Sequence, residues 1–265
     1  MNAGKSMWRR VDVIGETGST NADLIARAAA GDDVVGAVLV AEHQTAGRGR
    51  NGRSWSAPRG TQLTLSLGVS VDALPAVAWG WIPLATGVAV VDAVSETTGL
   101  RVGLKWPNDV LAAPSGQSHG FGKLAGILAE VATPQPVVVV GIGLNVSLAA
   151  DDLPDPGATS LSILGAHSVD RNVLLNHLLD ALQRRMEGLY SAGGADTALA
   201  SDYTAHSLTI GARVRATLPG EGELVGQAVR VDDQGRLCID TGTDVVAVSA
   251  GDIVHLRPLD EGLPG

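Results

Sequence analysis

The sequence predicts an α/β domain followed by a small β-rich domain. Up to about residue 206, apolar strand-like runs alternate with helical patterns, which is typical of a sheet flanked by helices. From residue 207 onward the pattern changes to short alternating runs separated by turns, which is typical of a small β-barrel. A chain of 265 residues, 45% of them hydrophobic, is long enough to build both. We therefore expect two domains, residues 1–206 and residues 207–265.

The first predicted elements are a helix and two strands. A capping hydroxyl at Ser19 precedes an acid, and apolar residues then recur at helical spacing as far as Gly31, so residues 20–30 are predicted to form a helix. The β-branched apolar run 34–41 predicts a strand. In residues 63–71, large apolar residues alternate strictly with threonine, serine and glycine, which predicts a strand with only one buried face.

A long helix and three further strands are predicted in the middle of the chain. Residues 75–98 are rich in alanine and valine without β alternation, which predicts one helix, kinked near Gly80 and Pro83. Strands are then predicted at residues 102–106, 123–131 and 137–146. The Gly-, Ser- and Pro-rich residues 112–122 between the first two of these strands are expected to form a mobile loop.

The last third of the chain starts with a helix and ends in strands. A helix is predicted to open at Asp170, with leucines and a methionine recurring along one face. The short strands of the second domain are predicted at residues 213–218, 223–231, 236–240 and 244–248. Turns rich in proline, glycine and aspartate separate them.

Composition excludes several classes of protein. The formal net charge is −9, so a general attraction to nucleic acid phosphates is not expected. A single cysteine, Cys238, excludes an internal disulfide framework and a cysteine-based zinc cluster. The N-terminus has no apolar run of signal-peptide length, and the uncharged runs 73–91 and 131–150 contain prolines or polar residues. We therefore expect a cytoplasmic protein with no membrane partner.

The most informative segment is the glycine- and arginine-rich stretch at residues 47–55. The chain has no acid between Glu42 and Asp72, yet four arginines lie there: Arg48, Arg50, Arg53 and Arg59. Guanidinium groups bind carboxylates or phosphates through paired hydrogen bonds, and the glycines let backbone N–H groups approach a ligand closely. The segment therefore predicts a local anion site, with a solvated basic loop as the alternative.

The same stretch matches G-x-G-x-x-G, so a dinucleotide-binding fold is an alternative. In that fold a helix follows the glycines and an acid lies about 20 residues further on. Asp72 has that spacing, but residues 53–62 contain Pro58 and Gly60 and leave no room for a helix. An NAD-dependent enzyme is therefore disfavoured.

Two further segments contain a lysine in apolar surroundings. They are residues 105–109, with the sequence KWPND, and residues 122–130, with the sequence GKLAGILAE. Taken singly, Lys105 and Lys123 could each be an edge lysine whose head reaches solvent. The two segments indicate a function only in combination with the arginine-rich stretch.

Together these segments, in this order, resemble the biotin protein ligases. The segments that carry the resemblance are residues 18–21, 44–55, 105–109, 122–128 and 141–145. The resemblance implies a mixed sheet with flanking helices, similar to that of class II aminoacyl-tRNA synthetases, and a small C-terminal SH3-like β-barrel. Some members of the family carry an N-terminal helix-turn-helix and repress transcription. Here only about a dozen residues precede the first strand, so no DNA partner is expected.

The resemblance also implies a two-step reaction. In the presence of Mg²⁺, biotin reacts with ATP to give biotinyl-AMP and pyrophosphate. A lysine of a biotin carboxyl carrier domain then takes the biotinyl group, and AMP is released. Three other functions stay open: a lipoate or octanoate ligase, which needs an apolar tunnel for its acyl tail, a non-catalytic biotin or nucleotide sensor, and the disfavoured NAD-dependent enzyme. Because a reactive acyl adenylate must be kept from water, we expect residues 47–60 to close over it as a lid.

The resemblance implies roles for particular residues. The expected catalytic residues are Arg50, Lys105 and Lys123. Biotin contacts are expected from Ser19, Thr20, Asn21, Gln44, Arg48, Gly49, Arg50, Lys123 and Gly126, because hydroxyl and amide groups suit the neutral ureido ring. Nucleotide contacts are expected from Arg50, Trp55, Lys105, Asn108 and Asn145. The side chains of Trp55 and Trp106 are candidates to form walls of the binding site. The alternative for each is a place in the hydrophobic core.

Overall fold

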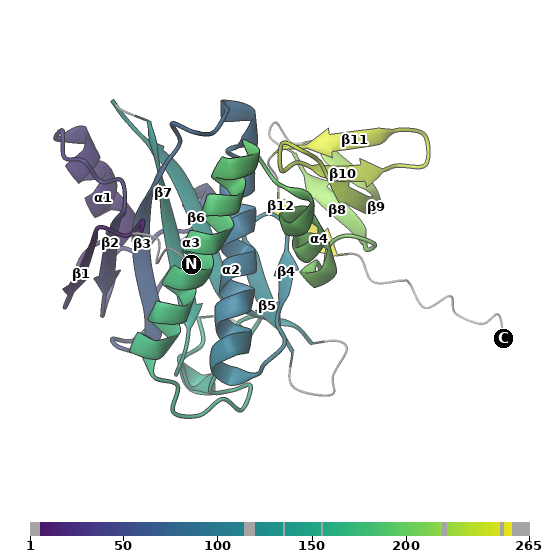
Figure 1. Ribbon diagram of the computed structural model, residues 1–265. Helices are drawn as coiled ribbons and strands as arrows, with labels where there is room; N and C mark the ends of the chain where they lie inside the picture. The colour runs from purple at the N-terminus through teal and green to yellow at the C-terminus, as the bar shows by residue number, and fades with distance from the viewer. Residues whose placement is uncertain are drawn as a thin grey trace.

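The computed structural model describes residues 6–113, 120–134, 136–154, 156–218, 222–249 and 252–255. These residues form a seven-stranded mixed sheet with helices on both faces, and a separate five-stranded antiparallel sheet (Figure 1). The predicted fold class, a mixed α/β domain with a small C-terminal β domain, is confirmed. The division between residues 206 and 207 stays a prediction.

The large sheet has the strand order β1-β2-β3-β7-β6-β5-β4. Its strands are β1 (Arg10–Ile14), β2 (Ala37–Ala41), β3 (Gln62–Ser70), β4 (Gly103–Lys105), β5 (Asp109–Ala112), β6 (Gly122–Ala132) and β7 (Val137–Asn145). The pair β1 and β2 is parallel, and every other pair is antiparallel. The predicted mobile loop 112–122 has its centre, residues 114–119, outside the described residues.

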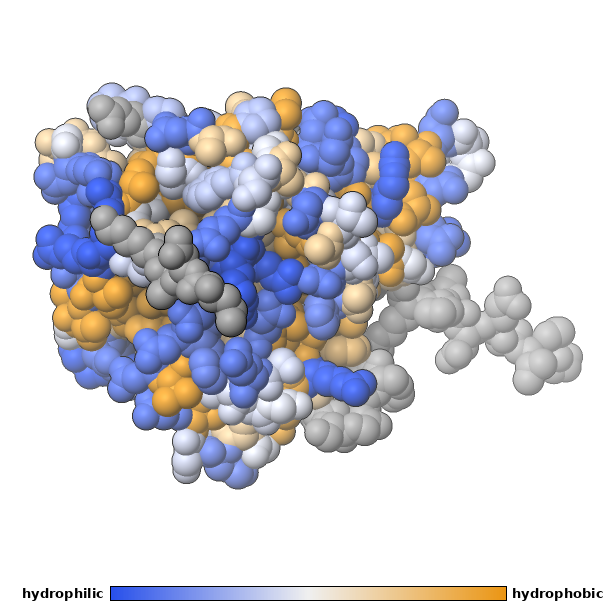
Figure 2. Space-filling view, in the orientation of Figure 1, coloured by the Kyte–Doolittle hydropathy of each residue, from blue (hydrophilic) through white to orange (hydrophobic). Residues whose placement is uncertain are grey.

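The two faces of the large sheet are covered by different helices (Figure 1). Helix α1 (Thr20–Ala29) packs its buried Leu24 with Leu39 and Val139 on one face. Helices α2 (Trp81–Thr98) and α3 (Arg171–Ala192) join the main core with the residues that point the other way, such as Leu65. Hydrophilic side chains predominate on the molecular face that carries α3, so the leucines of this helix point inward (Figure 2).

Several sequence predictions are confirmed and others are corrected. The helices predicted to open near Ser19 and at Asp170 are confirmed, with these two residues as their N-caps. The long helix begins only at Trp81, after a short 3₁₀ turn at Ala76–Ala78. Pro83 lies in the first helical turn, where an N–H would have no intrahelical partner, so proline is tolerated there.

Strand β3 is buried on both faces, so the prediction of a half-buried strand is wrong. Its polar face lies beneath α1 and a cavity instead of facing solvent. Helix α4 (Thr197–His206), strand β5 and three short 3₁₀ helices, Arg50–Gly52, Ala76–Ala78 and Ala150–Asp152, were not predicted. Short elements of this kind give weak periodic signals, because few residues repeat in them.

The C-terminal sheet has the strand order β11-β10-β9-β8-β12. Its strands are β8 (Arg213–Thr217), β9 (Glu223–Val231), β10 (Leu237–Asp240), β11 (Val245–Val248) and β12 (Asp252–His255). The first four match the predicted strands, and β12 was not predicted. Within the part of the chain that the structure describes, none of the helices combines the length and the apolar character needed to cross a bilayer.

Candidate active site

A cavity of about 500 Å³ opens on the sheet face that carries α1. All of the predicted site residues except Asn145 line it: Ser19, Thr20, Asn21, Gln44, Arg48, Gly49, Arg50, Trp55, Lys105, Asn108, Lys123 and Gly126. These residues come from the start of α1, from the loop after β2, from the β4–β5 hairpin and from β6. The fold therefore brings segments that are more than a hundred residues apart in sequence around one space.

Glycines on the central strands give the cavity its depth. A Cβ atom on Gly141 would collide with the side-chain amide of Asn21, and one on Gly143 would collide with the indole of Trp55. Both glycines lie on β7, and Gly143 is paired with Gly126 of β6. Without side chains at these positions, Asn21 and Trp55 can lie directly against the strand backbone.

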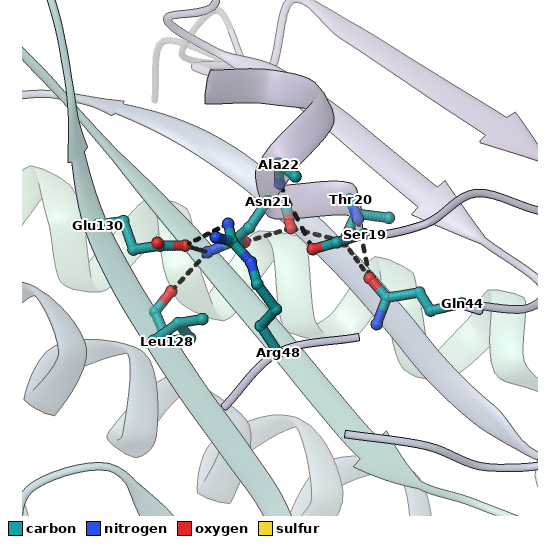
Figure 3. Close-up of polar contacts among 9 residues, drawn as sticks. Ser19, Thr20, Asn21, Ala22, Gln44, Arg48, Leu128 and Glu130 are labelled. Atoms are coloured by element: carbon teal, nitrogen blue, oxygen red, sulfur yellow. Dashed lines mark hydrogen bonds and ion pairs between the residues drawn. The ribbon is translucent and has the colours of Figure 1, made fainter. Parts of the chain in front are cut away.

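The end of the cavity next to α1 is a buried network of neutral polar groups (Figure 3). The hydroxyl of Ser66 donates to Asn21 Oδ1 at 2.5 Å and lies 2.6 Å from Thr20 Oγ1. Because a hydroxyl has a single hydrogen, Ser66 accepts from Thr20, whose hydroxyl is also within 3.1 Å of Gln44 Oε1. Gln44 Oε1 accepts from the backbone N–H of Thr20 at 2.8 Å. The polar groups at this end are thus oriented before any ligand arrives.

Two residues of β6 hold the other side of the same network. The Asn21 amide donates to the carbonyl of Leu128 at 3.1 Å and to Glu130 Oε2 at 2.9 Å (Figure 3). Arg48 donates to the same Glu130 oxygen at 3.2 Å, so Glu130 connects the start of α1 with the arginine-rich loop. The Arg48 and Glu130 side chains are 45% and 30% exposed, which makes this ion pair weak.

The opposite end of the cavity is strongly cationic. The described lining residues include five cationic side chains and one carboxylate, Asp109; Arg48 pairs with Glu130 beside α1, which leaves Arg50, Arg53, Lys105 and Lys123 for this end. Two of the cations are held in place: Arg50 Nη1 donates to Asn108 Oδ1 at 3.1 Å, and Lys123 Nζ lies 2.7 Å from Asp109 Oδ1. Lys123 Nζ also lies 5.5 Å from the centre of the Trp55 ring. This excess of positive charge favours an anionic ligand.

The two tryptophans of the predicted site have different roles. Trp55 is a wall of the cavity, and its indole N–H donates to Gln62 Oε1 at 3.1 Å. Trp106 also touches the cavity, but its side chain is only 2% exposed, and its indole N–H donates to the carbonyl of Gly235 in the C-terminal sheet. Trp106 is therefore mainly a packing residue between the two sheets.

Asn145 lies behind the cavity wall instead of lining it. It is 1% exposed, and its side chain accepts from Gln62 Nε2 at 2.7 Å and donates to the carbonyl of Thr159 at 2.8 Å. With both ends of its amide occupied inside the protein, Asn145 supports Gln62, which does line the cavity.

Sequence reasoning missed Gln62, Thr64 and Ser66 on β3, and also Asp109 and Glu130. The cavity is lined by Gln62 and Thr64, and Ser66 supports it from below. A signal for the first three was present, because small polar residues alternate with leucines along β3. We assigned that polar face to solvent, since the pattern of one strand does not reveal what packs above it.

Comparisons with known proteins agree with this site. The profile of the Biotin/lipoate A/B protein ligase family matches residues 32–147, and that of the Biotin protein ligase C terminal domain matches residues 209–256. The chain is 54% identical, over 95% of its length and 91% of the relative's, to a Mycobacterium tuberculosis protein named Biotin--[acetyl-CoA-carboxylase] ligase. This chain belongs to the biotin protein ligase family.

Two further similarities place the chain among these ligases. A Paracoccus denitrificans protein with the same name is 33% identical, over 86% of this chain and 92% of that protein. The solved structure of the biotin protein ligase from Aquifex aeolicus in complex with biotin and ATP is 25% identical, with a TM-score of 0.77 over 94% of this chain and 99% of the other. The resemblance found in the sequence motifs is thus confirmed.

Proposed function

We propose that this chain is an ATP-dependent biotin protein ligase. It activates biotin as biotinyl-5′-AMP with release of pyrophosphate, and transfers the biotinyl group to a lysine of a biotin carboxyl carrier domain. The observation that carries this proposal is a single cavity with a buried neutral polar end and a cationic end. The neutral end suits an uncharged ureido ring, and the cationic end suits a carboxylate meeting a polyphosphate.

The names of similar proteins support the same reaction. The relative from M. tuberculosis is named as a ligase that joins biotin to acetyl-CoA carboxylase. The A. aeolicus structure contains biotin and ATP, and a Leishmania major structure, 25% identical with a TM-score of 0.60, contains biotinyl-5-AMP. ATP, biotin and a carboxylase carrier domain are therefore the partners that we assign to this chain.

At the neutral end, the side chains next to α1 would hold the biotin ring. Thr20 and Asn21 are fixed by their bonds to Gln44, Ser66 and β6, so a ring entering this end meets donors and acceptors that need not reorganise. Ser19 is oriented as the N-cap of α1, since its hydroxyl accepts from Ala22 N–H at 3.4 Å. Gly49 and Gly126 leave backbone accessible for the ligand.

At the cationic end, charge compensation is the main task in the first step. A carboxylate that approaches a phosphate to about 4 Å is repelled by about 4 kcal/mol per unit charge pair at an effective dielectric of 20. That repulsion alone would slow the reaction about a thousandfold. We assign its compensation to Arg50, Lys105 and Lys123, which also stabilise the charge that develops during transfer.

Magnesium enters as the complex with ATP. The described residues contain no group of three or more acidic, histidine or cysteine side chains that could hold a metal ion. Magnesium bound to a nucleotide usually takes one or two carboxylates and otherwise phosphate oxygens and water, so the cavity chemistry fits, with Asp109, which also pairs with Lys123, as the carboxylate among the described lining residues. When bound, the ion neutralises phosphate charge.

A lipoate or octanoate ligase is the second candidate, because one matching family profile covers both biotin and lipoate ligases. A lipoyl or octanoyl tail needs apolar walls. The end of the cavity next to α1 contains instead the buried polar groups of Thr20, Asn21 and Ser66. An apolar tail would gain less from burial against these polar groups than it would in an apolar tunnel.

We also propose that the reaction takes place in the cytoplasm. The chain has one cysteine, Cys238, and this residue is buried and unpaired in the structure. Disulfides are characteristic of oxidising compartments, so their absence in the composition fits a reducing one. Localisation of the full-length chain by fractionation of cells tests this assignment.

The decisive experiment measures pyrophosphate release from Mg–ATP with biotin, and separately with lipoate or octanoate. A biotin carrier domain is then added to the biotin reaction, and its labelling is followed by mass. We expect biotin-dependent release and a carrier that gains one biotinyl group. Release with lipoate alone would contradict the proposal in favour of the sister activity, and biotin binding without release would indicate a sensor.

A further inference from the structure

A turn of the C-terminal sheet docks on two tryptophans of the large domain. Residues 232–235 connect β9 to β10, and they lie at the start of α2 (Figure 1). The indole N–H of Trp81 donates to the carbonyl of Asp232, and that of Trp106 donates to the carbonyl of Gly235, both at 3.0 Å. Both indoles are buried. The two ends of one turn are therefore held by two donors from the large domain.

The docking contact leaves no room for a side chain. A Cβ atom on Gly80 would collide with the carbonyl oxygen of Gln234, and one on Gly235 would lie 2.7 Å from the Gly80 backbone. Gly80 has φ −59° and ψ −21°, a conformation that any residue adopts. Glycine at this position is therefore needed for the close approach between the two domains, and not for the backbone conformation.

The turn is shaped by its own hydrogen bonds. The Asp232 carboxylate accepts from the backbone N–H groups of Gln234 and Arg236 at 3.0 and 2.9 Å, and from Arg236 Nε at 2.8 Å. Burial raises the pKa of Asp232, but these hydrogen bonds outweigh burial and hold the pKa below its usual value. The turn is thus a preorganised element that meets the large domain as a unit.

Trp106 links this docking contact to the cavity. It belongs to residues 106–108, the tip of the β4–β5 hairpin, and its backbone N–H donates to Thr209 Oγ1 at 3.1 Å. At the other side of the tip, Asn108 Nδ2 donates to the carbonyl of Ile127 at 3.0 Å. The tip is therefore held between β6 and the C-terminal part of the chain, and the cavity is lined by Asn108 of the tip and by Lys105 and Asp109 on either side of it.

We propose that docking of residues 232–235 positions the β4–β5 hairpin tip and thereby sets the affinity of the cavity for the nucleotide. Gly80 and Trp106 are positioning residues in this role. Ile253 of β12 also lines the cavity, so the C-terminal sheet contributes directly to its wall. The inference rests on the function proposed above in taking ATP as the substrate at the cationic end.

The test separates docking from folding by a substitution that adds one methyl group. Gly80→Ala is compatible with the local backbone but collides with the docked turn. Gly188→Ala, in α3, is the matched control, because its Cβ would meet only Asp196 Oδ2 at an ordinary 3.6 Å. We expect Gly80→Ala to raise the KM for Mg–ATP about tenfold with the KM for biotin nearly unchanged. Amide hydrogen exchange in residues 103–112 should accelerate as well.

A second variant approaches the contact from the hairpin. Trp106→Phe keeps an aromatic ring but leaves the Gly235 carbonyl without its indole donor, so the same rise in the KM for Mg–ATP is expected. The proposal is overturned if Gly80→Ala leaves both the KM for Mg–ATP and hydrogen exchange in residues 103–112 unchanged, whatever Trp106→Phe does. Wild-type protein that releases no pyrophosphate with biotin would refute the proposed function, while hydrogen exchange in Gly80→Ala would still decide the docking inference.

Discussion

At the α1 end of the cavity the polar side chains are buried and bonded to one another, whereas at the loop end the arginines project from a segment that is mostly exposed. Thr20, Asn21 and Ser66 are all at most 3% exposed. Residues 51–54 of the loop are all exposed. Buried polar groups must be fully hydrogen-bonded and are therefore fixed in one arrangement, while exposed cations can move at little cost. The α1 end is thus preformed, whereas the exposed part of the loop is free to adapt to a ligand.

Substitution of Arg50 is expected to have the largest effect on activity. Arg50→Ala removes a cation to which we assign charge compensation during transfer, so adenylate formation should fall about 10²–10³-fold, while the melting temperature should change little because a loop arginine has few core contacts. Arg59→Ala is the matched control from the same loop, since Arg59 pairs with Glu16 at 3.2 Å and does not line the cavity. Single-turnover formation of the adenylate measures the effect. Wild-type rates in Arg50→Ala would refute the role assigned to Arg50.

The preformed end can be broken by adding one methyl group beneath it. Gly141→Ala would push the Asn21 amide out of its network, and we expect a loss of about 100-fold in kcat/KM for biotin, equivalent to about 3 kcal/mol. If the effect acts through Asn21, the double variant with Asn21→Ala should be no worse than Asn21→Ala alone. Additive losses would show that Gly141 acts by another route.

A smaller effect is expected when one bond of the network is removed. Ser66→Ala leaves Asn21 Oδ1 without its hydroxyl donor and leaves the Thr20 hydroxyl with Gln44 Oε1 as its partner, so the free energy of unfolding should fall by about 1–2 kcal/mol and the KM for biotin should rise. The Ser70 hydroxyl, at the end of the same strand, bonds to Asp72 alone among the described residues, so Ser70→Ala should change the stability by less than about 0.5 kcal/mol. Chemical denaturation of both variants makes the comparison, and equal losses would contradict it.

The smallest expected change is in dynamics alone. If residues 47–60 close over the adenylate as a lid, biotin plus Mg–ATP should slow amide hydrogen exchange there, while residues 20–24 of α1 should be protected already in the free protein. Hydrogen exchange followed by mass spectrometry reports both segments in one experiment. Unchanged exchange in residues 47–60 on addition of both substrates would refute the lid.

Sequence reasoning located the residues that line the cavity better than it located the packing around them. The segments around Arg50, Lys105 and Lys123 were found from local charge and glycine content, which do not depend on what lies across the fold. Asn145 was assigned to the ligand, although the fold turns its amide toward Gln62 and Thr159. A side chain on a central strand can face either way, and the sequence pattern of β7, rich in valine and glycine, does not distinguish its two faces.

By itself the sequence determined the fold class, the predicted strands and helices, and the residue types that meet in the cavity, because periodicity and charge are local properties of the chain. Only the tertiary structure decided that the polar face of β3 lies beneath α1, that Glu130 joins Asn21 to Arg48, and that a turn of the C-terminal sheet docks at Gly80. These contacts join residues more than forty positions apart. Such pairings depend on how whole elements pack, which no local pattern encodes.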